Sequence, residues 1–160
     1  MFASTDKRAR HTAEIVSEKI KKSIEFFEDL VEMRRPSELW GKPLSDEKAQ
    51  EIFKLLREHR DNPDWRYSNE ENFTDRKTRA SRVVNMLLER KEEVGLVVSH
   101  GTAIRTIVIY MLLGDDLTAH NYYQFLRFFH LSNTGISLCK YFEDESRWQL
   151  IHWNDIAHLG

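Results

Sequence analysis

Residues 94–113 read VGLVVSHGTAIRTIVIYMLL, and this stretch decides the fold class. Its first part, Val94 to Val98, is a short apolar run rich in β-branched residues, which predicts a strand buried on both faces. Its second part, Ala103 to Leu113, predicts a helix. A buried strand that passes directly into a helix is typical of α/β proteins with a mostly parallel sheet.

The turn between these two elements, Ser99-His100-Gly101-Thr102, is the first candidate site. In open α/β sheets, ligands bind beyond the carboxyl ends of the strands. Gly101 lets the backbone approach a ligand closely, and free N–H groups at the start of the next helix point at an anion. His100 could then donate a hydrogen bond to a phosphate oxygen. The alternative is a histidine that only caps the helix or packs in the loop.

Helices and strands alternate along the rest of the chain, which predicts an α/β fold with a mostly parallel sheet and an antiparallel edge. Thr5 or Asp6 could cap the first helix, and Leu30 to Met33 is either a short strand or a loop. The remaining predicted elements are a first helix with apolar positions from Ala13 to Phe27, helices over Asp46 to His59, Thr74 to Lys91 and Asp116 to Phe129, and a hairpin of two strands, Gly135 to Phe142 and Arg147 to Trp153.

Length and composition predict a single domain over residues 1–160, because 41% of the residues are hydrophobic and 31% are charged. The net charge of -2 gives no global field that would attract nucleic acid or an anionic membrane. The longest apolar run, Ile107 to Gly114, is too short to span a bilayer, and the charged N-terminus does not read as a signal peptide. Cys139 is the only cysteine, so we expect a reducing cytoplasm.

A second motif lies at the N-terminus, where residues 4–13 read STDKRARHTA. Together with the turn at His100, it resembles the histidine phosphatases, the phosphoglycerate-mutase-like superfamily. The second motif of that family runs Ser, three residues, Arg-Ala, two residues, Thr-Ala, and each position is filled here. The late motif, an apolar strand that ends in Ser/Gly-His-Gly, is matched by residues 97–101. Shorter similarities are Leu30-Val31-Glu32, residues 70–73 with Arg79, residues 133–136 and the closing segment 148–159.

The resemblance implies a three-layer, phosphoglycerate-mutase-like sandwich whose first central strand ends in a nucleophilic Arg-His-Gly. Arg10-His11 is followed by Thr12, so we expect His11 to be a solvated helical residue and not the nucleophile. The family's Arg-His-Gly is therefore absent from these residues, and we expect an N-terminally truncated domain. The absent strand is expected between the strands that carry the second and late motifs.

By resemblance, the reaction is transfer of a phosphoryl group from a phosphomonoester to a histidine, followed by hydrolysis. Arg8 would pair two phosphoryl oxygens with its planar guanidinium, although it could also be an ordinary surface arginine. Glu32 would be the general acid, with Glu38 as its rival and a solvated glutamate as the plain alternative. His100 would stabilise the transferring group beside the N–H groups of Gly101 and Thr102.

Without the attacking imidazole, we expect a nearly inactive phosphatase that keeps part of a phosphate site. The alternative is a non-catalytic module that binds a phospho-ligand or a protein. A mutase is less expected, because residues 32–42 lack the Glu-Arg-His-Tyr-Gly of true mutases, and a nucleic-acid binder is disfavoured by interleaved charges on the first helix. The expected ligand is a small phosphorylated metabolite or phosphate, with no cofactor and no metal. Its identity and the oligomeric state stay open.

Overall fold

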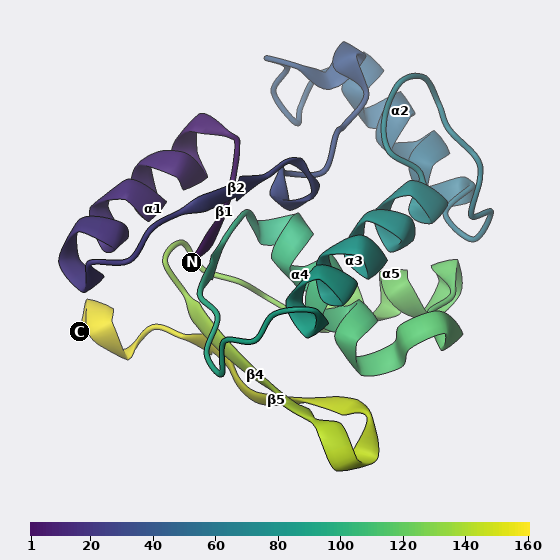
Figure 1. Cartoon of the computed structure of the whole chain (residues 1–160). Helices are drawn as coiled ribbons and strands as arrows, with labels where there is room; N and C mark the ends of the chain where they lie inside the picture. Colours follow the sequence, from purple (N-terminus) through teal and green to yellow (C-terminus); the bar gives the residue numbers. More distant parts are fainter.

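The computed structural model describes residues 1–160, and its centre is a three-stranded parallel sheet. The strands are β1 (Phe2–Ser4), β2 (Glu25–Phe27) and β3 (Val97–Val98), in the order β2-β1-β3. Helix α1 (Lys7–Ile20) covers one face of this sheet, and α3 (Phe73–Leu88) with α4 (Gly101–Leu113) covers the other (Figure 1). The predicted parallel α/β architecture in three layers is confirmed.

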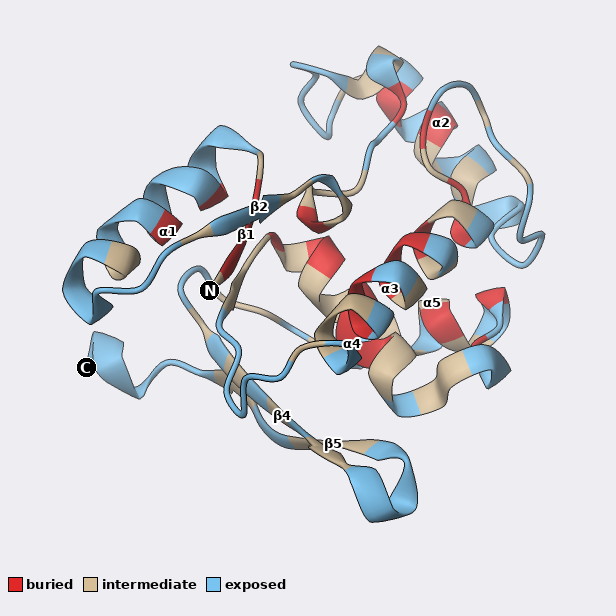
Figure 2. Ribbon diagram, in the orientation of Figure 1, coloured by how far each residue is buried: buried red, intermediate tan, exposed pale blue.

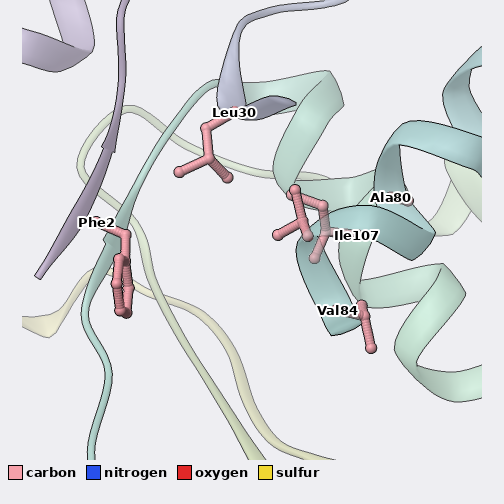
Figure 3. Packing of buried hydrophobic residues seen from close by; sticks show 6 residues of the cluster. Phe2, Leu30, Ala80, Val84 and Ile107 are labelled. Carbon is pink, nitrogen blue, oxygen red and sulfur yellow. The ribbon is translucent and has the colours of Figure 1, made fainter. Parts of the chain in front are cut away.

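The side chains of β1 point alternately toward the two helical layers and are buried in the core. Phe2 packs in a buried cluster with Leu30, with Ala80 and Val84 of α3, and with Ile107 of α4 (Figure 3). Ala3 is fully buried on the opposite face, under α1. The small buried residues of α1, Ala9 and Ala13, let this helix approach the sheet closely.

The predicted hairpin is also present, as an antiparallel pair of strands β4 (Ile136–Phe142) and β5 (Arg147–Asp155). This pair forms a sheet of its own and is not hydrogen-bonded to the three parallel strands. Trp148 of β5 packs against the Phe2 cluster, so the hairpin is held to the body of the molecule by side chains. Figure 2 shows that the hairpin is half-buried or exposed along its length, whereas β1 is buried.

The expected position of a gap between the strands of the second and late motifs was wrong. Strands β1 and β3 pair directly, with Phe2 opposite Val97 and Ala3 opposite Val98. These two motifs therefore stand on neighbouring strands, and the interruption of the sheet falls elsewhere, between β3 and the hairpin of β4 and β5.

Two predicted boundaries also differ from the structure. The first helix does not continue to Phe27, because Lys21 adopts a left-handed conformation (φ 55°) that ends it, and the following residues join the sheet as β2. The strand expected over Val94 to Val98 shrinks to Val97–Val98, and Val94 is 86% exposed. Strand β3 lies at the edge of its sheet, so solvent reaches a segment whose composition predicts burial on both faces.

The remaining helices follow the sequence prediction closely. Helix α2 (Glu47–Glu58) begins at Asp46, whose carboxylate accepts a hydrogen bond from the N–H of Ala49. Helix α5 (Ala119–Phe128) packs its buried Tyr122 against α3 and α4. None of these helices combines the length and apolarity that a membrane-spanning segment needs.

Candidate functional site

The candidate site lies where β1 and β3 end, because parallel neighbours bring the residues that follow them to the same edge of the sheet. Strand β1 ends at Ser4, and His100 follows two residues after β3. The Nε2 atom of His100 lies 3.0 Å from the Oγ atom of Ser4, and the His100 residue is only 7% exposed. The first residue of the N-terminal motif thus contacts the histidine of the late motif.

Asp6 joins the same cluster, although the sequence suggested only a capping role for it. It occupies the N-cap position of α1, yet its side chain makes no capping hydrogen bond. Its Oδ2 atom instead accepts a hydrogen bond from the N–H of Glu32 (3.1 Å) and lies 3.2 Å from Nε2 of His100. Aspartate is common at the N-cap of helices, so its presence before α1 did not predict a contact with Glu32 or His100.

Glu32 lies at the N-terminus of α4, the helix that follows His100. One carboxylate oxygen accepts a hydrogen bond from the N–H of Thr102 and the other from the N–H of Ala103, each at 3.2 Å. The N–H of Met33 donates to the same carboxylate at 2.8 Å. The rival acid Glu38 instead accepts a hydrogen bond from Ser68 (2.8 Å), on the loop before α3. Of the two candidate acids, Glu32 is the one that contacts the predicted anion site.

Arg8 is exposed on the first turn of α1, and its guanidinium forms no ion pair. Its charge nevertheless acts on His100. Burial lowers the pKa of His100 below its ordinary value, and the positive charges of Arg8 and Arg79 lower it further, against the opposing charges of Asp6 and Glu32. Charged side chains from three separate segments thus surround the His100 imidazole.

A buried ion pair fixes the segment that carries Glu32. The guanidinium of Arg79 on α3 pairs with both carboxylate oxygens of Glu71 at 2.7 and 2.8 Å. Its Nη1 atom donates to the carbonyls of Val31 (2.6 Å) and Asp29 (3.1 Å), just before Glu32. On the other side, the Glu71 carboxylate accepts a hydrogen bond from the N–H of Arg34 (3.0 Å). One flank of Glu32 is thus tied directly to α3, and the other is tied to it through Glu71 on the preceding loop.

The remaining candidate residues differ in their exposure to solvent. Thr102 is buried, and its N–H is taken by Glu32. A β-carbon placed on Gly101 would have nothing within 4 Å, so open space lies beside this residue. His11 is exposed on α1, where the sequence places it. The other histidines, His59, His120, His130, His152 and His158, are also exposed.

Comparison with known proteins agrees with the fold. The family model of the histidine phosphatase superfamily (branch 1) matches residues 1–156. The structure of Bacillus stearothermophilus YhfR aligns over 99% of this chain and 75% of that one, with a TM-score of 0.77 and 20% identity. A mycobacterial glucosyl-3-phosphoglycerate phosphatase with inorganic phosphate aligns over 100% and 78% (TM-score 0.73, 20% identity). The alpha-ribazole phosphatase from Shigella flexneri aligns over 96% and 72% (TM-score 0.70, 22% identity).

None of the curated proteins matches this sequence significantly. At identities near 20%, the similar structures establish a shared fold, while the family match rests on the sequence itself. Since that match spans nearly the whole chain, this protein belongs to the histidine phosphatase superfamily, branch 1.

Proposed function

We propose that this chain is the phosphate-binding part of a phosphomonoesterase that works through a phosphohistidine intermediate. The observation that carries the proposal is the meeting of His100, Glu32 and the N-terminus of α4 at the ends of two parallel strands. Two of the similar structures are phosphatases by name, and one of them contains inorganic phosphate. The expected ligand is accordingly phosphate or a small phosphorylated metabolite.

Each residue of the site has a role that its chemistry supports. Besides the attacking histidine, phosphoryl transfer needs hydrogen-bond donors and positive charge around the phosphoryl oxygens. The free guanidinium of Arg8 would bind two of these oxygens, and His100 with the N–H groups of Gly101 and Thr102 would hold the third. Glu32 would protonate the leaving oxygen and later activate water.

The attacking histidine is proposed to come from outside these 160 residues. The chain has seven histidines, and His100 is the only one that is buried. The other six are exposed, and none of them follows a buried apolar strand. Removal of a covalent nucleophile abolishes most of the rate and leaves only positioning and electrostatics. The chain by itself should therefore be nearly inactive on phosphomonoesters.

The interruption of the sheet supports a missing strand. Strand β3 and the hairpin of β4 and β5 do not pair with each other. Large apolar side chains of these segments are exposed, among them Leu96 before β3 and Ile136 and Leu138 of β4. The buried Nε1 atom of Trp148 on β5 has no hydrogen-bond acceptor. An additional strand beside β3 would supply hydrogen-bonding partners and cover apolar surface.

Turnover of p-nitrophenyl phosphate tests this proposal. We expect the chain alone to show no turnover above background, because no imidazole is placed to attack. A version extended at its N-terminus by a strand that ends in Arg-His-Gly should gain activity, and His100→Ala in that version should abolish most of it. Robust turnover by the unextended chain, lost in His11→Ala, would contradict the proposal.

A second candidate function is a non-catalytic module that binds a phospho-ligand, favoured by the absence of a second buried histidine. The genomic reading frame ahead of Met1 separates the two. An in-frame apolar strand ending in Arg-His-Gly supports the enzyme, and its absence supports the binding module.

The group attached to the phosphate is proposed to contact the segments 34–75 and 115–130. A shallow hollow, partly open to solvent, lies between the loop after α2, the start of α3 and α5. It is lined by Glu71, the ion-pair partner of Arg79, and by the stacked rings of His59 and Trp65. The buried Arg76 also lines it, and the Nε atom of this arginine has no hydrogen-bond acceptor. Variable loops of this kind set the specificity of many enzymes.

A further inference from the structure

The N-terminus of α4, to which the proposed function assigns phosphoryl oxygens, already holds a carboxylate. The two oxygens of Glu32 accept one hydrogen bond each from the N–H groups of Thr102 and Ala103, both at 3.2 Å. Two oxygens of a bound phosphate would use the same kind of donors. Glu32 therefore occupies the N–H of Thr102, one of the two backbone donors assigned to the phosphate, together with the neighbouring N–H of Ala103.

A second carboxylate, that of Asp6, lies beside Glu32 and His100. Oδ2 of Asp6 accepts a hydrogen bond from the N–H of Glu32 (3.1 Å) and lies 3.2 Å from Nε2 of His100. The N-terminus of α4 thus holds the Glu32 carboxylate, and Nε2 of His100 lies 3.0 Å from Oγ of Ser4 with Asp6 beside it, while the guanidinium of Arg8 forms no ion pair. Two negative charges stand in the place that the dianion must enter, which disfavours its binding through repulsion.

We propose that Glu32 and Asp6 form an internal carboxylate latch, which closes the anion site until the Glu32 carboxylate leaves the N-terminus of α4. This inference rests on the proposed function, since it concerns the regulation of the same site. Loss of a site residue ordinarily weakens ligand binding, whereas the latch predicts that Glu32 itself disfavours the binding of phosphate. Loss of the Glu32 side chain should strengthen the binding of inorganic phosphate.

Calorimetric titration with inorganic phosphate tests the latch on five versions of the chain. Glu32→Ala should bind phosphate about tenfold more tightly than the unaltered chain, because charge-assisted hydrogen bonds no longer have to be broken. The matched control is Glu28→Ala, which removes an equal charge at an exposed position four residues earlier and should change Kd by less than about twofold. Glu32→Gln keeps an acceptor for the helix N–H groups, so it should increase the affinity for phosphate less than Glu32→Ala does. Because it also keeps the shape of the side chain, it tests the latch even if Glu32→Ala fails to fold.

The possible outcomes separate the latch from the proposed function. If the unaltered chain binds phosphate and neither Glu32 variant binds it more tightly, the latch is wrong and the phosphate site stands. If the unaltered chain and both folded Glu32 variants all fail to bind, the phosphate site itself is wrong. If Glu32→Ala gains affinity and a further His100→Ala change removes it, both inferences are supported.

Discussion

At the scale of single residues, the sequence motifs nominate Arg8, Glu32 and His100, and the structure brings the last two together around the N-terminus of α4. Asp6 could not be predicted in this way. Its contacts join residues separated in sequence by 26 and by 94 positions (32 − 6 and 100 − 6), and no local pattern encodes such distances. Its own motif position predicts only a helix cap, a role in which the structure shows no side-chain hydrogen bond.

The depressed pKa of His100 predicts a dependence of stability on pH. Because burial lowers this pKa in the folded state, the unfolded chain binds more protons at His100 when the pH falls below about 6.5, the ordinary value. The free energy of unfolding should thus decrease from pH 7.5 to pH 5.5, and urea denaturation at each pH measures it. His100→Gln should flatten this dependence, whereas His11→Gln at an exposed position should leave it as it is. An unchanged slope in His100→Gln would contradict a buried imidazole whose pKa is lowered by folding.

At the scale of elements, amphipathic spacing predicts α2 and α3 to within a few residues, because their apolar stripes face the core. The short strands were harder to predict. Strands β1 and β2 have only three residues each, too few for a periodic pattern, and they exist because they pair with each other in register. Ile24 and Phe27 continue the helical spacing of apolar residues in α1. This segment nevertheless forms strand β2, because it pairs with β1.

The ion pair of Arg79 with Glu71, which holds the segment around Glu32, gives a prediction at the same scale. Arg79→Met leaves the Glu71 carboxylate buried without its partner, so the free energy of unfolding should fall by about 3–5 kcal/mol. Arg82→Met is the matched control on the same helix. Its pair with Asp29 is largely exposed to solvent, and its loss should cost about 0–1 kcal/mol. Equal losses in the two variants, measured by urea denaturation, would contradict a structural role for the buried pair.

At the scale of the whole molecule, three distant segments meet because parallel strands end at one edge. The sequence resemblance predicts this meeting of residues 4–13, Glu32 and His100, and the direct pairing of β1 with β3 supplies the reason. The same topology leaves the hairpin of β4 and β5 in a sheet of its own. The position of that interruption depends on long-range pairing, so it could be found only in the structure.

The central claim is that a guanidinium, an imidazole and a helix N-terminus form one phosphate site, and a phosphate titration followed by NMR tests it most directly. The backbone signals of Gly101 and Thr102 and the side-chain signals of Arg8 and His100 should shift together with a single Kd. Arg8→Ala and His100→Ala should each weaken binding about tenfold or more. Arg10→Ala, whose guanidinium stacks on Phe26, should leave binding unchanged. Separate Kd values for these groups, or an equal loss in Arg10→Ala, would contradict the claim.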